Sequence, residues 1–215
     1  MRTKTLLLAA ALSAAGIISS VAQSNVYSIN VVGYVNRDCT GNGAFTLLAN
    51  PLDSGTNTLN GVLAAALPAN SKVLKWNGTG FTTYQRTASG WLPPSAGTVT
   101  VNPGEGFFVQ TPNPSAAVPI TFVGNVLQGS LTNNYPLLFN LSGNLFPDSG
   151  TLTSLGMTPP ANDKILLWNG VGYTTYTKTA SGWLPPAGPS INVADGFFVN
   201  TPAGTFSWVR NVTVN

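Results

Sequence analysis

An identical internal repeat is the feature of the chain that most constrains its fold. Residues 87–94 read Thr-Ala-Ser-Gly-Trp-Leu-Pro-Pro, and the same eight residues return at positions 179–186. They lie inside a longer self-similarity with a period of about 90 residues, and such a period sets the architecture ahead of local propensity. The sequence therefore predicts two tandem homologous modules, residues 23–118 and 119–215, that arose by internal duplication.

The first 22 residues have the pattern of a secretory signal peptide. Arg2 and Lys4 precede an uncharged apolar run at positions 6–18, and Ser20-Val21-Ala22 places small residues where signal peptidase cleaves. A membrane-spanning helix needs about 20 apolar residues, more than this run supplies. We therefore expect cleavage before Gln23. The mature chain is expected to be exported, without a transmembrane anchor, to the outside of the cell, its surface or the periplasm.

The charge of the mature chain argues against a nucleic-acid partner. Loss of the signal leaves seven basic against six acidic residues, so the net charge falls from +3 to +1. Phosphate binding requires clustered Lys and Arg, whereas the basic residues here are scattered singly. The partners expected are an extracellular or cell-surface polymer or protein, or a second copy of the chain.

The missing residue types restrict the available chemistry. Histidine is absent, which removes Ser-His and Cys-His nucleophile pairs and the commonest zinc ligand. Cys39 is the single cysteine, so it either packs as a small buried apolar side chain or cross-links two molecules. No calcium-loop spacing of acids is present. We expect no metal, no cofactor and no enzyme activity.

The local pattern is that of strands joined by tight turns. From Val26 onward, short runs rich in Val, Thr, Phe, Tyr and Trp alternate with Gly, Asn and Pro. Asn77-Gly78 and Asn169-Gly170 each separate two such runs, and Asn-Gly tolerates positive φ at both turn positions, so each predicts a β-hairpin. The only helical candidate is 62–67. The expected fold class is all-β, with each module a β-sandwich or jelly-roll-like meander.

Two further features of the repeat concern turns and module boundaries. Hairpins lead into the two Phe-Phe-Val runs, and because Ala194 stands where the first copy has Gly104, positive φ is expected at Gly106 and Gly196. One strand type occurs three times, at 29–35, 120–126 and 206–212. Three copies bracket two modules, so strand 120–128 is a candidate for a strand that both modules share.

A repeated acidic element suggests one enzyme class. Asp53-Ser54-Gly55-Thr56 recurs as Asp148-Ser149-Gly150-Thr151. It resembles the Asp-Ser/Thr-Gly-Ser/Thr element of pepsin-like and retroviral aspartic proteases, two-lobed all-β enzymes whose facing carboxylates share a proton. The flanks depart from that family, because Pro51 and Pro147 stand where a strand would run into the aspartate. An Asx-type turn capped by Asp and Ser explains both copies without an enzyme.

The repeated aromatic residues are the other candidates for a site. Exposed Trp and Tyr faces stack on sugar rings, but small β-modules without disulfides also need large aromatics in their cores. Trp91 and Trp183 lie beside Gly and Pro at a turn and are the candidate ligand-binding residues. The repeated pairs are Trp76 and Trp168, Phe81 and Tyr173, Tyr84 and Tyr176, and Trp91 and Trp183.

Three segments carry a family resemblance. Residues 45–51 read Phe-Thr-Leu-Leu-Ala-Asn-Pro, residues 75–81 read Lys-Trp-Asn-Gly-Thr-Gly-Phe, and residues 102–109 read Asn-Pro-Gly-Glu-Gly-Phe-Phe-Val. Their order resembles uncharacterised secreted β-repeat modules of Verrucomicrobia- and Bacteroidetes-like bacteria, which read apolar-Asn-Pro, Trp-Asn-Gly and Gly-x-Gly-Phe-x-Val. The second copy departs at Phe139-Asn140-Leu141, which lacks the Pro. The resemblance implies export and a β-fold, but no activity.

Together these observations predict an exported, non-enzymatic β-protein with a structural, adhesive or assembly role at or outside the cell surface. Carbohydrate binding through Trp91 and Trp183 is the alternative, and an aspartic protease using Asp53 and Asp148 is the third. Solvent exposure of the two tryptophans would favour sugar binding. Hydrogen-bonding reach between the two aspartates would favour the protease.

Overall fold

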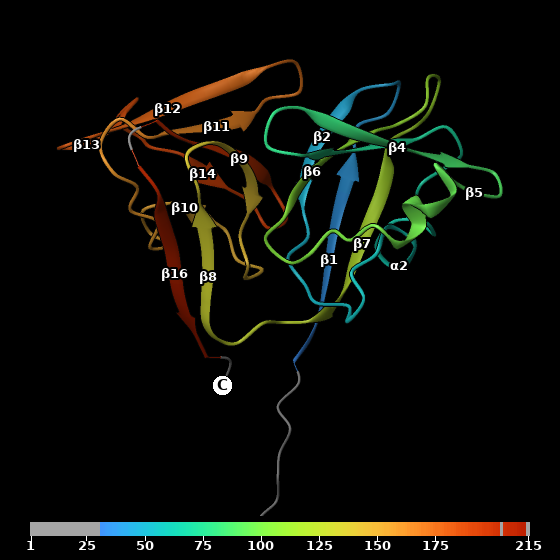
Figure 1. The fold of residues 1–215 in the computed structure, drawn as a ribbon, viewed down its shortest axis with the longest axis horizontal. Helices are drawn as coiled ribbons and strands as arrows, with labels where there is room; N and C mark the ends of the chain where they lie inside the picture. Colours follow the sequence, from blue (N-terminus) through green and yellow to red (C-terminus); the bar gives the residue numbers. More distant parts are fainter. Residues whose placement is uncertain (1–30, 203, 214–215) are drawn as a thin grey trace, which may run out of the picture. The chain divides into compact units, whose positions relative to one another are not determined.

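The computed structural model describes residues 31–202 and 204–213, and most of their regular structure is β-strand (Figure 1), which confirms the all-β class. The predicted signal peptide and its cleavage before Gln23 lie outside the described residues. The first half of the chain contains β1 (Val32–Cys39), β2 (Phe45–Ala49), α2 (Leu59–Val62), β3 (Lys72–Trp76), β4 (Phe81–Thr87), β5 (Gly90–Leu92), the 3-10 helix η2 (Pro94–Thr98), β6 (Gly106–Gln110) and β7 (Val118–Asn125). The second half contains β8 (Gly129–Tyr135), β9 (Leu138–Gly143), β10 (Gly150–Thr151), β11 (Lys164–Trp168), β12 (Tyr173–Thr179), β13 (Gly182–Leu184), β14 (Ser190–Ile191), β15 (Gly196–Thr201) and β16 (Phe206–Val212).

Each half contains a five-stranded antiparallel sheet, and the two sheets have the same strand order. The first runs β2-β6-β3-β4-β5 and the second runs β9-β15-β11-β12-β13. Both predicted Asn-Gly hairpins are present, as β3–β4 and β11–β12. Their turns are alike, since the Oδ1 atoms of Asn77 and Asn169 accept hydrogen bonds from the amides of Gly80 and Gly172, each at 2.9 Å. The matching order is what a duplication predicts, and the duplication itself stays a prediction.

Each half also has a two-stranded antiparallel ribbon, β1 with β7 and β8 with β16. β7 pairs along its length with β1, its Asn125 bridges to Asp53, and its Val118 and Ile120 lie in the core of the first half. β7 therefore pairs within the first half, and the second half has a strand of its own, β8, that pairs with β16. The module boundary after residue 118 and the shared strand 120–128 stay predictions. The sequence did not predict β8, because its Ser, Thr and Asn residues do not show the alternation of apolar and polar side chains that is typical of a strand.

The expected helix at 62–67 is corrected, because the structure has a single helical turn, α2, that begins three residues earlier, at Leu59. α2 begins after Thr58, whose side chain accepts from the amide of Gly61, and it ends at Val62. Leu59 and Leu63 are buried and contribute to the first core. No helix of the described residues is long and apolar enough to cross a membrane.

Three hydrophobic clusters hold the structure together. One fills the first half, between its five-stranded sheet, α2 and the β1–β7 ribbon, and one fills the second half. The third contains side chains of both halves, and its members come from equivalent positions. They are Phe45 and Phe139, Leu47 and Leu141, Leu74 and Leu166, Trp76 and Trp168, and Phe108 and Phe198, with Phe139 joined through its ring contact to Phe198.

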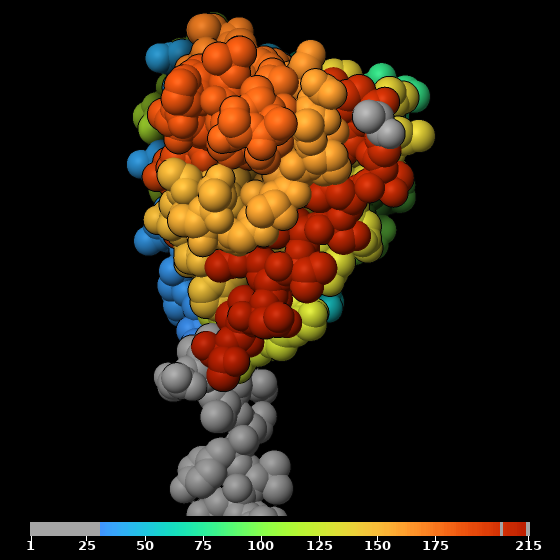
Figure 2. Space-filling view, turned by 90° about the vertical axis from the view of Figure 1, so that its left-hand side faces the viewer, coloured from blue at the N-terminus to red at the C-terminus, as the bar shows by residue number. Residues whose placement is uncertain are grey.

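The contacts between the halves are reciprocal. The amide of Ala49 donates to the carbonyl of Ala194, and the equivalent amide of Gly143 donates to the carbonyl of Gly104, both at 2.9 Å. Reciprocity of this kind is the signature of an approximate twofold relation. Both halves fall in one compact unit, so the two predicted modules are parts of a single body. Figure 2 views this body from the side of the second half, whose C-terminal strand β16 is red.

Backbone pairing closes a circuit of four strands across the two halves. β2 pairs with β6 and β9 with β15, while the bridges Leu48–Asp195 and Glu105–Ser142 join β2 to the start of β15 and β9 to the start of β6.

Two glycines make this approach of backbones possible. A Cβ on Gly106 would lie 2.8 Å from the carbonyl oxygen of Ser142, and one on Gly196 would lie 2.6 Å from that of Leu48. The expectation of positive φ at these two positions is wrong, because the positive φ values fall at Gly104 (77°) and Ala194 (63°). Gly106 and Gly196 are required for space rather than for backbone conformation.

Candidate functional site

Trp91, the first predicted ligand-binding residue, belongs to the core. It is only 6% exposed and packs in the first hydrophobic cluster. Its indole Nε1 donates to Oδ1 of Asn60 at 2.9 Å, and the Arg86 guanidinium lies 5.9 Å from its ring centroid. The geometry of Trp91 therefore supports core packing over ligand binding, the two roles left open by the sequence.

Trp183 is half-buried and is also engaged. Its ring packs against the second core, its Nε1 donates to Thr153 Oγ1 at 3.0 Å, and Lys178 Nζ lies 5.9 Å from the ring centroid. Gly188 also lies against the ring, because a Cβ there would be 2.9 Å from Cδ1. Trp91 is thus buried, and Trp183 is partly buried with its indole N–H already paired.

The two repeated aspartates have separate roles within their own halves. Asp53 Oδ1 accepts from the amide of Gly55 at 2.8 Å and from Asn57 Nδ2 at 2.7 Å, which is an Asx-type turn. Asp148 forms a bidentate ion pair with Arg210, with both N–O distances at 2.7 Å. Among the hydrogen bonds of the described residues, none joins the two carboxylates, so the geometry does not favour the shared proton of an aspartic protease.

Cys39 lies in the core of the first half and is fully buried. Burial, with a smaller contribution from the neighbouring Asp38 carboxylate, raises the pKa of its thiol to about 12. The thiol therefore stays protonated at neutral pH. The geometry supports the packing role of Cys39 over intermolecular cross-linking.

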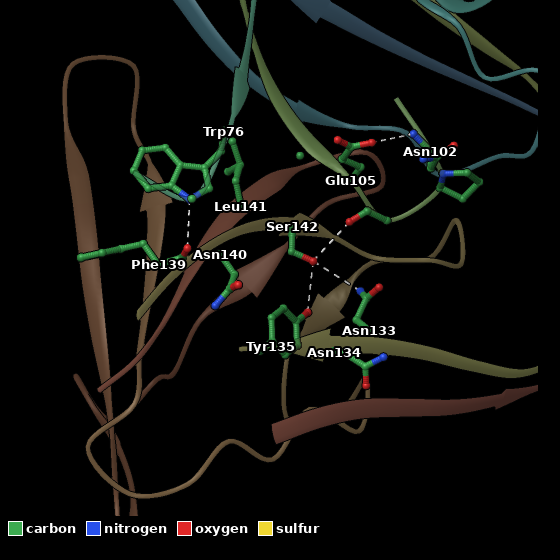
Figure 3. A pocket seen from close by; sticks show the side chains of 14 residues that line it. Trp76, Asn102, Glu105, Asn133, Asn134, Tyr135, Phe139, Asn140, Leu141 and Ser142 are labelled. Carbon is green, nitrogen blue, oxygen red and sulfur yellow. Dashed lines mark hydrogen bonds between the residues drawn. The ribbon is translucent and has the colours of Figure 1, made fainter. Parts of the chain in front are cut away.

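A polar cleft at the junction of the halves brings together residues that the repeat analysis did not single out as a site (Figure 3). It has a volume of about 430 Å³. We call it the first cleft. Side chains of both halves line it: Trp76, Asn102 and Glu105 from the first, and Asn133, Asn134, Tyr135, Phe139, Asn140, Leu141 and Ser142 from the second.

The floor of the first cleft is a connected hydrogen-bond network. Ser142 Oγ donates to the carbonyl of Gly104 at 3.2 Å and lies 3.2 Å from the Tyr135 hydroxyl, as Figure 3 shows. Asn133 Nδ2 donates to the carbonyl of Gly143 at 2.9 Å. Burial raises the pKa of Tyr135 well above its ordinary value, so this hydroxyl remains neutral. A satisfied network of this kind fixes the positions of its members.

Amides at the rim retain hydrogen-bonding capacity. Asn134 Oδ1 accepts from Ser207 Oγ at 2.7 Å, and Asn140 Nδ2 donates to the carbonyl of Pro136 at 2.7 Å. Each side-chain amide carries both a donor and an acceptor group. Within the described residues, the Nδ2 of Asn134 and the Oδ1 of Asn140 make no hydrogen bond to the protein.

Aromatic rings form one wall of the first cleft. Trp76 Nε1 donates to the carbonyl of Phe139 at 3.0 Å (Figure 3), which holds the indole across the junction. Trp76 and Phe139 also line an apolar groove of about 230 Å³, and Phe139 is 41% exposed. Polar and apolar surfaces thus meet at these two residues.

The charged residue of the first cleft is neutralised. Glu105 Oε1 lies 2.7 Å from Lys75 Nζ, and Glu105 Oε2 accepts from the amide of Asn102 at 3.0 Å. Every other side chain that lines the cleft is uncharged. The site therefore favours an uncharged ligand. In the described part of the chain, no three His, Cys, Asp or Glu side chains gather as metal ligands.

Comparison with family models, with curated proteins and with solved structures finds no match to this chain. The resemblance to secreted bacterial β-modules stays a prediction.

Sequence reasoning missed the first cleft because its residues come from both copies. One signal was available. Asn133 and Asn134 lie side by side in a strand, where Asn is disfavoured, and a run of unfavourable polar residues in a strand indicates a role other than packing.

Proposed function

We propose that the protein is a non-enzymatic carbohydrate-binding protein that holds a neutral sugar in the first cleft. The observation that carries the proposal is the combination, in one cleft, of several asparagine amides and hydroxyl groups with exposed aromatic carbon and no unpaired charge.

The chemistry of a neutral sugar matches these surfaces. Its hydroxyl groups both donate and accept, as do the side-chain amides of Asn102, Asn134 and Asn140. Its C–H faces are apolar and pack on aromatic rings, and Phe139 and Trp76 supply such carbon at the cleft wall. The volume of about 430 Å³ lies in the range of small-molecule sites.

The proposal keeps the predicted adhesive role and changes the residues that perform it. An exported protein that binds a neutral polysaccharide attaches to an extracellular polymer, which is the partner class expected from composition. The binding residues are those of the first cleft rather than Trp91 and Trp183, whose rings are engaged within each half.

The proposal is tested by calorimetric titration of residues 23–215 with neutral tetrasaccharides of β-1,4-linked glucose, N-acetylglucosamine and mannose. At least one is expected to bind. The double variant Asn102→Ala/Asn134→Ala is expected to lose about tenfold to a hundredfold in affinity, because each lost neutral hydrogen bond costs about 0.5–1.5 kcal/mol. Both side chains are exposed, and the hydrogen bonds that the variant removes, from Ser207 Oγ to Asn134 and from Asn102 to Thr100 Oγ1, are exposed as well, so the melting temperature should change little.

Asn211→Ala is the matched control, because Asn211 is an exposed strand asparagine outside the cleft. It should bind like the unmodified chain. Absence of binding to all three sugars, or equal binding by the double variant, would refute the proposal.

A further inference from the structure

A second cleft lies on the other side of the junction, at the position related to the first by the approximate twofold. It has a volume of about 420 Å³ and, like the first, is lined by residues of both halves. We call it the second cleft. The lining residues on which the argument rests are Arg37, Phe45, Thr46, Trp168, Asn192 and Asp195.

The aromatic wall of the second cleft reproduces that of the first. Trp168 Nε1 donates to the carbonyl of Phe45 at 2.9 Å, as Trp76 Nε1 does to that of Phe139 at 3.0 Å. The Trp168 ring makes an edge contact with Phe108 at 5.2 Å between centroids, and Trp76 makes the same contact with Phe198 at 5.3 Å. Each indole is thus held across the junction in the same way.

One polar element of the first cleft, an asparagine beside a carboxylate, is reproduced as well, whereas Thr46 stands at the position of Asn140. The amide of Asn192 donates to Asp195 Oδ2 at 2.7 Å, as the amide of Asn102 donates to Glu105 Oε2 at 3.0 Å. In both clefts the asparagine side chain is exposed at the mouth. The carboxylate beside it is paired with a cation, Lys75 for Glu105 and Arg37 for Asp195.

The two clefts differ in which half supplies that cation. Lys75 comes from the same half as Glu105, whereas Arg37 reaches Asp195 from the opposite half. Arg37 and Tyr135 hold equivalent positions in the two ribbons. Arg37 pairs with Ile120 and Tyr135 pairs with Phe206, and Ile120 and Phe206 are the first residues of the two similar segments 120–126 and 206–212. A guanidinium donor and a carboxylate acceptor side by side match the adjacent hydroxyl groups of a sugar, and charged partners form the stronger hydrogen bonds.

We infer that the second cleft is a second carbohydrate site, so that one chain carries two sites for neutral sugars. The inference rests on the function proposed for the first cleft. Two sites on one rigid body let a single molecule hold two polysaccharide chains, or two parts of one chain with a gain in avidity.

The test is the stoichiometry of tetrasaccharide binding by residues 23–215, with the same three tetrasaccharides. Asn102→Arg and Asn192→Arg place a large polar side chain at equivalent exposed positions, each of which fills one cleft. The unmodified chain is expected to bind two molecules, and each variant one. The double variant Asn102→Arg/Asn192→Arg should bind none, and all should melt at the temperature of the unmodified chain.

A second measurement reports on bivalency. A long polymer of the sugar that binds should be precipitated by the unmodified chain, and neither single variant should precipitate it. One bound tetrasaccharide that Asn102→Arg abolishes and Asn192→Arg leaves intact would overturn the second site while the proposed function stands. No binding by the unmodified chain would refute both.

Discussion

Gly143 faces Ala49 at the centre of the junction, and a Cβ on Gly143 would lie 2.0 Å from the Cβ of Ala49. The two residues hold equivalent positions, at the ends of β9 and β2. Two equivalent residues that face each other lie on the approximate twofold axis. The space between Gly143 and Ala49 holds one methyl group but not two.

This contact predicts a compensating pair of substitutions. Gly143→Ala should destabilise the protein by about 1–3 kcal/mol, because a well-packed contact has to expand. Adding Ala49→Gly should restore most of that loss, since it returns one methyl group to the same space. Urea denaturation measures both effects, and a double variant no more stable than Gly143→Ala would contradict the contact.

Gly196→Ala should also destabilise, by about 1–3 kcal/mol, because the new methyl group meets backbone that cannot rotate away. Gly80→Ala is the control, since a Cβ there has no neighbour within 4 Å and no positive φ. Equal denaturation midpoints for the two variants would show that β2 does not approach Gly196 as described.

Asp163 predicts a pH-dependent change in stability. Its carboxylate is buried without a hydrogen-bond partner in the described residues, and burial raises its pKa. Because the folded state holds the proton more tightly than the unfolded state, this group favours folding below its unfolded pKa of about 3.9. That contribution is lost as the pH rises through the folded pKa.

Asp163→Ser, which copies Ser71 of the first half, should therefore stabilise the protein at pH 7. The gain should shrink as the pH falls toward 4. Asp38→Ser, at an exposed position, controls for the change in net charge. Denaturation curves at several pH values measure the difference, and a gain independent of pH would argue against burial of the charge.

Trp91→Ala should destabilise by about 3–5 kcal/mol, the usual cost of removing a large core aromatic. Trp183→Ala should cost less, because Trp183 is only half-buried. Molecules that remain folded should bind sugar with unchanged affinity in both variants. Loss of sugar binding by folded Trp91→Ala protein would return the site to the predicted residues.

The parts of the fold that depend on local chemistry could be predicted from the sequence. The two Asn-Gly hairpins form as expected, with positive φ at Gly78 (100°) and Gly170 (102°), a conformation that glycine adopts without steric cost, but not at Asn77 or Asn169. The burial of Trp91 could not be predicted. An aromatic side chain beside Gly and Pro is buried only if other residues pack over it, and here Asn60 and the first hydrophobic cluster do so.

The clefts were beyond sequence reasoning for a related reason. The sequence repeat shows which residues of the two halves are equivalent, such as Trp76 and Trp168. It does not show which non-equivalent residues meet in a cleft, as Trp76 and Phe139 do. The glycines at 106 and 196 indicate the close approach of the other half, but a glycine in a turn is usually explained by a positive φ. Their role becomes visible only when the strand of the other half is in place.

Two similar halves in one chain escape a restriction that identical subunits face. In a homodimer, any substitution appears on both sides of the axis, so Ala49 would have to meet another alanine and the two clefts would have the same lining. In this chain each side can change alone. Gly143 can accommodate Ala49, and Arg37 can line one cleft while the buried Tyr135 lines the other, so each cleft can change its lining while the shared centre stays fixed.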